Sequence, residues 1–231
     1  WSSPVVAEVA GRPQLLTCGD PFVIAYDPND GKELWRCKCL SADVGPSPIA
    51  FDKYVFAANQ SPRSTCIDAS GSGDVSTTNI AWSGNGALPD TTSPLAVRTG
   101  DRWDVYTLAT TGYLVCYDPS NIRNNRAVYW ELELGEGMAN FYSSPAFFGG
   151  KIYCFDKSED APTAYVIDPA KVPKGPDGAV ATGQIEPEAA KEMIVATNPL
   201  PEPIVSSPAV ADGKLFFRGP KTVYCIATRA E

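Results

Sequence analysis

The chain has 231 residues, of which 19 are basic and 27 acidic, giving a formal net charge of −8. This charge argues against binding to nucleic acid or to an anionic membrane surface, and no apolar run is long enough to span a bilayer. Histidine is absent, which excludes Ser-His-Asp triads, histidine general bases and imidazole metal sites.

The first 44 residues predict four short strands, at 5–7, 14–18, 23–26 and 33–37. A polar turn joins the last two strands. The Asp27 carboxylate is placed to accept hydrogen bonds from backbone N–H groups of this turn, and Gly31 tolerates the positive φ that the turn needs. The second strand of the hairpin carries Trp35. Because two strands alone are only marginally stable, burial of this indole predicts a neighbouring copy of the same unit.

Copies of this unit recur along the chain. Ser-Pro pairs start five segments, at Ser3, Ser47, Ser93, Ser144 and Ser207. Four segments continue to an aspartate at the end of a predicted strand (Asp27, Asp68, Asp118 and Asp168), and three reach a tryptophan (Trp35, Trp82 and Trp130). Short strands recurring roughly every 45 to 65 residues are typical of β-propeller blades. The sequence therefore predicts one all-β propeller domain with four-stranded antiparallel blades, its repeats at about 1–44, 45–90, 91–141, 142–204 and 205–231.

The later repeats predict strands in the same order. We expect them at 49–51, 54–58, 64–67 and 80–82, at 95–97, 105–109, 114–117 and 128–132, and at 146–148, 151–155 and 164–167. The fourth repeat then carries an insertion, 169–203, in which residues 187–192 favour a short helix with proline in its first turn.

The fifth repeat predicts only three strands, at 209–210, 215–218 and 223–226. An unpaired outer strand would expose a template for another strand. We therefore expect the chain to be the C-terminal part of a propeller of about seven or eight blades. Its N-terminal blades, or a second chain, would complete it.

The run from Ala25 to Trp35 resembles the tryptophan-docking motif of pyrroloquinoline-quinone (PQQ)-type propellers, Ala-x-Asp-x-x-Thr-Gly-Lys-x-x-Trp, with Asp30 in place of threonine. The Ser-Ser-Pro sequences at 143–145 and 206–208 are likewise typical of that repeat. The family includes quinone-dependent dehydrogenases, the outer-membrane-protein assembly lipoprotein and propellers without a bound quinone. The resemblance implies a bacterial periplasmic or extracellular location, although no signal peptide is visible in the chain.

Seven cysteines are spread over the repeats. Cys66, Cys116 and Cys225 hold the same position in three repeats, too far apart for disulfides, which predicts buried thiols that act as small hydrophobic residues. Cys37 and Cys39 differ, because they alternate on one predicted strand and so share a face. A disulfide or half of a zinc site is the alternative for this pair.

Two sets of residues are candidates for a ligand site at the mouth of a propeller channel. Oxygen-bearing side chains precede the Ser-Pro pairs and would suit a hard cation such as calcium, or simply hydrogen-bond within their turns: Asp43, Asp90, Asn140 and Glu202. Aromatic side chains in the same layer would stack on a planar ligand, or simply pack: Trp1, Phe141 and Tyr142.

The sequence favours a non-catalytic scaffold that binds a protein or peptide partner and needs no cofactor. The alternative, implied by the resemblance, is the C-terminal part of a PQQ- and calcium-dependent alcohol or sugar dehydrogenase. Such enzymes use a disulfide between adjacent cysteines near the quinone, and no two cysteines are adjacent in this chain.

Overall fold

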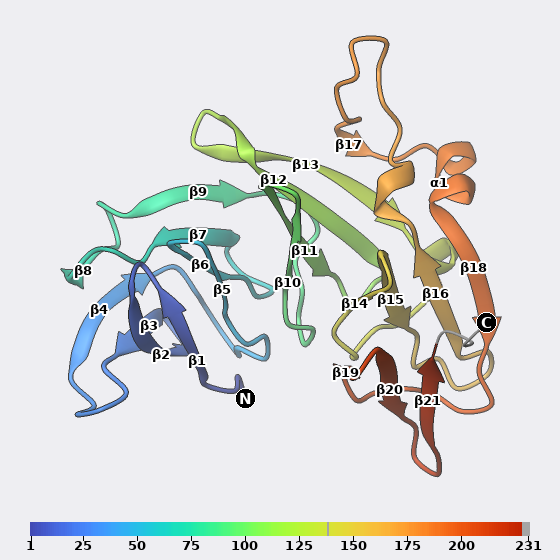
Figure 1. The fold of residues 1–231 in the computed structure, drawn as a ribbon, viewed down its shortest axis with the longest axis horizontal. Helices are drawn as coiled ribbons and strands as arrows, with labels where there is room; N and C mark the ends of the chain where they lie inside the picture. Colours follow the sequence, from blue (N-terminus) through green and yellow to red (C-terminus); the bar gives the residue numbers. More distant parts are fainter. Residues whose placement is uncertain (138, 228–231) are drawn as a thin grey trace. The chain divides into compact units, whose positions relative to one another are not determined.

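The computed structural model describes residues 1–137 and 139–227, and these form mostly antiparallel β-sheet (Figure 1). The chain divides into two compact units. The first comprises Trp1–Thr107 and Val115–Tyr129, and the second Leu108–Leu114 and Trp130–Glu231. Met138 in the third predicted repeat and residues 228–231 at the end of the fifth lie outside the described residues.

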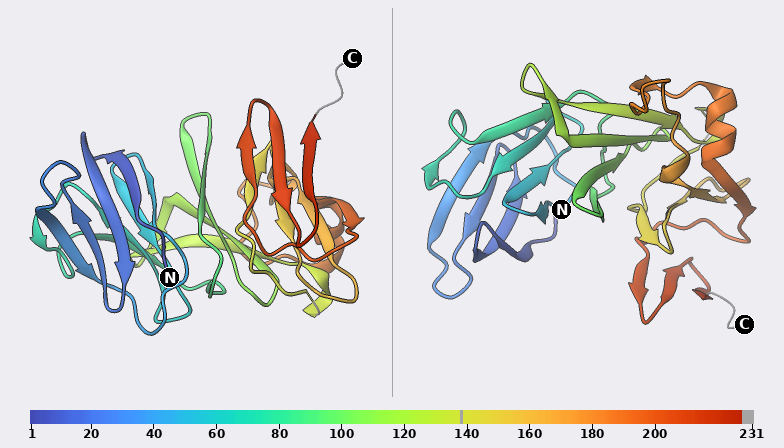
Figure 2. Two further views of the ribbon diagram at one scale, coloured as in Figure 1. Left: turned by 90° about the horizontal axis from the view of Figure 1, so that it is seen from below. Right: turned by 45° about the horizontal axis from the view of Figure 1, so that its top comes forward.

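The first sheet contains β1 (Val5–Val9), β2 (Arg12–Gly19), β3 (Phe22–Tyr26) and β4 (Glu33–Lys38), each antiparallel to the next. These four strands lie side by side (Figure 2), and a fifth, two-residue strand extends the sheet beyond β4. The predicted turn between β3 and β4 is confirmed. The N–H of Gly31, at φ +72°, donates to the Asp27 carbonyl at 2.9 Å, and the Asp27 carboxylate accepts the N–H of Asn29 at 2.8 Å.

The second sheet repeats this order with β5 (Ile49–Phe51), β6 (Tyr54–Ala57), β7 (Ser64–Asp68) and β9 (Ile80–Gly84). The third repeat contains β10 (Leu95–Thr99), β11 (Arg102–Leu108), β12 (Tyr113–Arg123) and β13 (Arg126–Glu133), which continue the same sheet because β13 pairs with β9. The residues of the third repeat are divided between the two compact units. The strands predicted for both repeats are present, and β11, β12 and β13 are longer than expected.

The second unit also holds a four-stranded sheet of β14 (Ala146–Phe148), β15 (Lys151–Phe155), β16 (Thr163–Ile167) and β18 (Ile194–Pro199). The insertion before β18 contains the short 3-10 helix η2 (Pro169–Lys171) and the predicted helix, α1 (Pro187–Met193), with proline in its first turn. A second 3-10 helix, η1 (Gly135–Gly137), follows β13. No helix among the described residues is long and apolar enough to cross a bilayer.

The last sheet comprises β19 (Ala209–Ala211), β20 (Lys214–Arg218) and β21 (Val223–Ala227). As predicted, the described residues of this repeat supply three strands. Cys225 lies on β21 and is exposed, which corrects the prediction of a buried thiol at this position. The reason is that Cys225 shares a face of the sheet with Ala209 and Phe216, which no described element covers fully.

Two-residue strands run parallel to the outer strands of preceding repeats, which the sequence did not predict. β8 (Gly73–Asp74) places Gly73 beside Trp35 of β4, and β17 (Gly183–Gln184) places Gly183 beside Trp130 of β13. Between the second and third repeats, Arg126 at the start of β13 pairs with Ser83 of β9 in the same parallel sense. β8 and β17 thus lie in the connection before the outer strand of their repeat, and Arg126 begins its outer strand; all three reach back to the outer strand of the repeat before.

The recurring Ser-Pro pairs are explained by hydrogen bonds between consecutive repeats. In the first unit, the N–H of Ser3 donates to Ser47 Oγ at 3.0 Å, and the N–H of Ser47 donates to Ser93 Oγ at 3.0 Å. In the second unit, the N–H of Ser144 donates to Ser207 Oγ at 3.1 Å. Proline lacks an N–H donor, so the serine before it supplies this contact.

Candidate functional site

The four repeated aspartates stabilise turns. Each carboxylate accepts the backbone N–H two residues later: Asp27 from Asn29, Asp68 from Ser70, Asp118 from Ser120 and Asp168 from Ala170. Two of them also pair with a lysine: Lys53, just before β6, places Nζ 2.7 Å from Asp68, and Lys151, the first residue of β15, places Nζ 3.2 Å from Asp168. These carboxylates are therefore engaged in local structure and do not point to catalysis.

The three motif tryptophans are buried, with Trp35, Trp82 and Trp130 exposing 0%, 2% and 4% of their surface. Trp35 lies in an apolar cluster shared by the first and second repeats. Trp82 packs against Phe56 and Tyr117 with ring centroids 5.4 and 5.7 Å away. In the fourth repeat the equivalent outer-strand position, opposite Val166, is Ala196. Without its tryptophan, this strand could not be located from the sequence.

The candidate cation ligands lie in both compact units, with Asp43 and Asp90 in the first and Asn140 and Glu202 in the second. The Glu202 carboxylate already accepts the N–H groups of Lys221 and Thr222 and the hydroxyl of Tyr224, each at 3.0 Å. Desolvation raises the pKa of Glu202, but these hydrogen bonds outweigh it and leave that pKa below its usual value. Within residues 1–137 and 139–227, no three acidic or cysteine side chains cluster as a metal site would require.

The candidate aromatic residues have different surroundings. Trp1 is 97% exposed, whereas Phe141 is fully buried and packs on Tyr165 with ring centroids 5.9 Å apart. Tyr142 is 40% exposed and carries the Lys157 ammonium 4.2 Å above its ring. The Phe141 ring is thus part of the core, and the Tyr142 ring already has a cation on one face.

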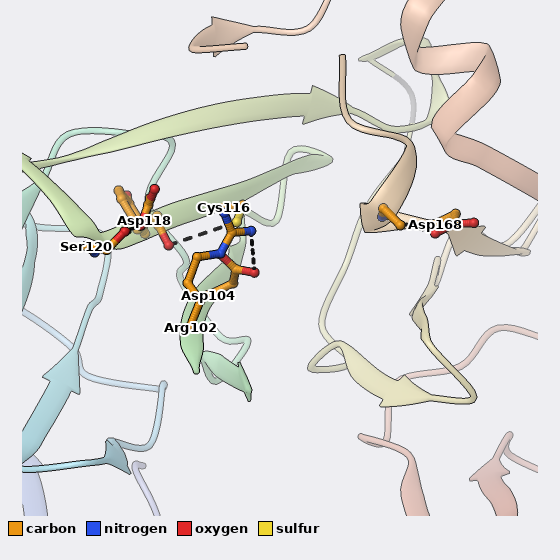
Figure 3. A network of polar contacts seen from close by, with 8 residues as sticks. Arg102, Asp104, Cys116, Asp118, Ser120 and Asp168 are labelled. Atoms are coloured by element: carbon orange, nitrogen blue, oxygen red, sulfur yellow. Dashed lines mark hydrogen bonds and ion pairs between the residues drawn. The ribbon is translucent and has the colours of Figure 1, made fainter. Parts of the chain in front are cut away.

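A polar cluster in the first unit, in which Asp104 and Cys116 are buried and Arg102 is exposed, was not predicted from the sequence. Arg102 Nη2 lies 3.0 Å from the carboxylate of Asp104, with Cys116 and Asp118 beside them on β12 (Figure 3). Desolvation raises the pKa of Asp104 despite the guanidinium, and it raises the pKa of the Cys116 thiol well above its ordinary value. A thiol held in its protonated form is a poor nucleophile. The cluster therefore fits a structural ion pair better than a reaction centre.

The insertion of the fourth repeat borders a pocket of about 630 Å³ in the second unit. The pocket lies within the size range of small-molecule and side-chain binding sites. Its lining comes from β13, η1, β16, β17 and the residue after it, α1 and β18: Glu133, Gly135, Tyr165, Gln184, Ile185, Pro187, Ala190, Lys191, Ile194 and Thr197. The pocket was not foreseen, because its residues are distant in the chain and follow no motif.

The lining of this pocket combines apolar, neutral polar and charged side chains, the charged ones being Glu133 and Lys191. Isoleucines, proline and alanine supply apolar walls, and Tyr165, Gln184 and Thr197 supply neutral hydrogen-bonding groups. The Lys191 ammonium at the pocket pairs with Glu188 of the same helix at 2.9 Å. A mixed apolar and polar lining of this kind can hold an amphipathic side chain of a partner.

Residues 19–171 match the family profile described as outer membrane protein assembly factor BamB. The chain belongs to this family. The fold predicted from the repeats, an all-β protein of PQQ-like propeller repeats, is in accord with this membership. No curated protein sequence matches the chain.

Solved structures support the BamB-type fold. The crystal structure of BamB from Moraxella catarrhalis matches with a TM-score of 0.64 and 15% identity, covering 97% of this chain and 57% of that chain. The computationally designed protein Ika8 matches with a TM-score of 0.55 and 10% identity, covering 91% of this chain and 56% of that chain. The chain thus spans a little over half the length of both proteins.

Proposed function

We propose that this chain is part of a non-catalytic PQQ-like β-propeller that serves as a scaffold for protein partners in the periplasm or outside the cell. The observation that carries the proposal is the match of residues 19–171 to the BamB family, described as an outer membrane protein assembly factor. An assembly factor acts by holding other proteins. The pocket beside α1 is the place where we expect a partner to bind.

Apolar sheet faces support the presence of further repeats or of a partner chain. On the first sheet, Val6 and Leu15 pair across strands and Val6 is 65% exposed. On the last sheet, Ala209 and Cys225 are exposed on either side of Phe216. Terminal repeats of stacked arrays need polar outer faces to stay soluble. We therefore propose that further propeller repeats, for a total of about seven or eight blades, or a second chain, cover these faces.

We also propose that the buried tryptophans dock against the following repeat. Trp35 lies beside Gly73, and Trp130 lies beside Gly183, both at positive φ. Glycine suits these two positions because residues with a side chain rarely adopt positive φ, and each glycine lets the connection run beside the outer strand of the repeat before it. This arrangement would couple each repeat to the next and make the scaffold rigid.

The dehydrogenase alternative draws support from the family resemblance alone. Its calcium would need a set of free oxygen ligands, and the Glu202 carboxylate, one of the candidates, already accepts three hydrogen bonds. One of the four candidate ligands is therefore already engaged, and the proposed function includes no chemistry on PQQ.

The scaffold proposal is tested by a partner that binds at the pocket. We would insert a photo-crosslinking residue at Thr197, an exposed lining residue, and identify cross-linked proteins from the cell envelope. The captured protein should bind the purified chain in calorimetry, and Thr197→Arg should abolish that binding, whereas Ser72→Arg on an exposed turn should not. Equal binding by the two variants would exclude the pocket as the binding site of the partner. Substrate-dependent dye reduction after addition of PQQ and calcium would overturn the scaffold itself.

A further inference from the structure

The outer strands of the first three repeats are each paired on their far side by a segment with one shared pattern. A residue at positive φ comes first, a polar residue follows and pairs with the residue after the motif tryptophan, and a buried apolar residue comes last. The three segments are Gly73-Asp74-Val75 on β4, Asn125-Arg126-Ala127 on β9 and Gly183-Gln184-Ile185 on β13. Glycine and asparagine adopt positive φ more readily than most residues, which gives the pattern a physical basis.

The residue after each tryptophan uses its outward backbone groups in this contact. The hydrogen bonds join the N–H of Val75 to the carbonyl of Arg36 at 2.9 Å, the N–H of Ile185 to the carbonyl of Glu131 at 2.8 Å, and the N–H of Ser83 to the carbonyl of Asn125 at 3.0 Å. In an antiparallel pair, successive residues turn their N–H and C=O groups alternately toward and away from the partner strand. The register with the third strand therefore decides which residue of an outer strand faces outward.

The outer strand of the fourth repeat, β18, offers a fourth edge of the same kind. Ala196 stands at the tryptophan position opposite Val166, Thr197 follows it opposite Tyr165, and the register shifts at the same point as in the first and second repeats. The N–H and C=O of Thr197 therefore point away from β16. Thr197 is exposed, and among the described residues β18 pairs with β16 alone, so it forms the outer edge of its sheet (Figure 1).

The apolar residue of such a segment needs a core to enter. Val75 belongs to the apolar cluster shared by the first and second repeats, and Ala127 to the cluster shared by the second and third. The fourth and fifth repeats share a cluster that contains Phe155 and Leu215, and Leu200, just after β18, is half-buried against it. An apolar side chain at the edge of β18 would therefore lose water contact against this cluster.

We infer that the outer edge of β18 binds an extended segment of a partner protein as a parallel strand. The segment places glycine beside Ala196, a polar residue such as aspartate or glutamine beside Thr197, and valine or isoleucine next. Main-chain hydrogen bonds to Thr197 attach the segment, and the glycine and the apolar residue select it. The described strands of the fifth repeat, β19 to β21, supply no such segment. This inference rests on the proposed scaffold function and names the kind of segment that the scaffold takes.

A synthetic peptide with the sequence of residues 180–188, which includes Gly183-Gln184-Ile185, is the probe. It is titrated into the nitrogen-15-labelled chain, and amide shifts and amide exchange with water are followed by NMR. We expect saturable shifts at residues 195–198. The Thr197 amide should exchange about ten-fold more slowly once it is hydrogen-bonded for about 90% of the time. The control is the same peptide with Gly183→Val, because valine rarely adopts positive φ, and it should bind at least about ten-fold more weakly.

Thr197→Pro in the protein removes the outward N–H and leaves the pairing with β16 in place, so the peptide should no longer shift β18. If this variant does not fold, the two peptides on the wild-type chain still decide the question. Unchanged β18 amides at millimolar peptide, equal binding of the two peptides, or shifts along β13 in place of β18 would overturn the inference. Shifts of β18 on simple dilution of the chain would assign the edge to a second copy and overturn it as well.

The inference and the pocket proposal fail separately. The pocket is tested through the Thr197 side chain, whereas the strand edge is tested through the Thr197 backbone. A captured partner that binds Thr197→Pro as tightly as the wild-type chain, but does not bind Thr197→Arg, would overturn edge pairing and leave the scaffold proposal standing. Peptide binding along β18 without any partner captured at the pocket would support edge pairing and count against the pocket.

Discussion

The indole Nε1–H of Trp35 donates a 2.8 Å hydrogen bond to Oε1 of Gln14, and both side chains are fully buried. The amide nitrogen of Gln14 in turn donates to the carbonyls of Val9 and Ala69, at 3.1 and 3.3 Å. Gln14 thus accepts the indole N–H of the first repeat and connects this tryptophan to the backbone of the second repeat. Buried polar groups of this kind are costly when they lose their partners.

Replacing Gln14 should therefore destabilise the first unit. Gln14→Leu leaves the Trp35 N–H and two carbonyls without partners in the core, and we expect a loss of about 1–3 kcal/mol in the free energy of unfolding. Urea unfolding followed by tryptophan fluorescence measures it. Gln60→Leu, at an exposed position, is the matched control and should change stability little. Equal stability of the two variants would show that the Gln14 contacts contribute nothing.

The two motif tryptophans of the first unit, Trp35 and Trp82, should respond differently to replacement by phenylalanine. Trp35→Phe removes the donor from the buried Gln14 oxygen, whereas Trp82 Nε1 has no hydrogen-bond partner among the described residues. Both substitutions remove similar apolar area, so the difference between their losses in unfolding free energy measures the hydrogen bond of Trp35. We expect Trp35→Phe to cost about 1 kcal/mol more than Trp82→Phe, as measured by urea unfolding. A larger loss for Trp82→Phe would contradict this explanation.

Gly84 should not tolerate a methyl group. A Cβ at Gly84 would lie 2.4 Å from Cε1 of the fully buried Tyr117 ring, which has no room to move away. We expect Gly84→Ala to lose about 1–3 kcal/mol through overpacking and to lower the thermal midpoint. Gly19→Ala is the control, since a Cβ there meets nothing within 4 Å. If Gly84→Ala and Gly19→Ala have the same thermal midpoint, the second and third repeats pack more loosely than described.

Asp68 should contribute a pH-dependent part of the stability. Partial burial raises its pKa, but hydrogen bonds from Lys53 and Ser70 outweigh burial and leave the pKa below its ordinary value. A carboxyl with a lower pKa in the folded state stabilises the protein above its unfolded pKa of about 3.9. This contribution is lost as the pH falls through the folded pKa.

Asp68→Asn should accordingly cost up to about 1 kcal/mol near neutral pH and almost nothing in strong acid. Denaturant unfolding at several pH values measures the difference. Asp27→Asn is the control. Asp27 stabilises the equivalent turn of the first repeat but forms no ion pair among the described residues. If Asp68→Asn lowers the free energy of unfolding by the same amount at all pH values, the loss comes from the hydrogen bonds of the turn and not from the charge of Asp68.

The strands were predictable wherever a turn signal and a tryptophan marked both ends of a hairpin, as between Asp27 and Trp35. β18 was not located, because Ala196 stands at the tryptophan position and a long insertion precedes the strand. β8 and β17 have only two residues each and exist because another repeat supplies their partner strand. No local pattern can indicate such a segment.

The candidate site was less predictable than the fold. The aspartates recur because turns need them, and their repetition said nothing about ligands. The pocket combines Glu133, Tyr165 and Thr197 from three strands with residues of α1, and only the three-dimensional arrangement brings them together. Gln14 was missed for the same reason, since one amide in a strand does not reveal which indole lies opposite.

The backward-reaching connections have a consequence for synthesis on the ribosome. The outer strand β4 is paired on its far side by β8, and β13 by β17, each from the repeat translated next. The far side of the outer strand in a newly made repeat therefore stays unpaired until roughly another 40 residues have emerged from the ribosome. The outer strands of the first three repeats are each paired by the repeat that follows, so completion of these repeats should lag one repeat behind elongation of the nascent polypeptide.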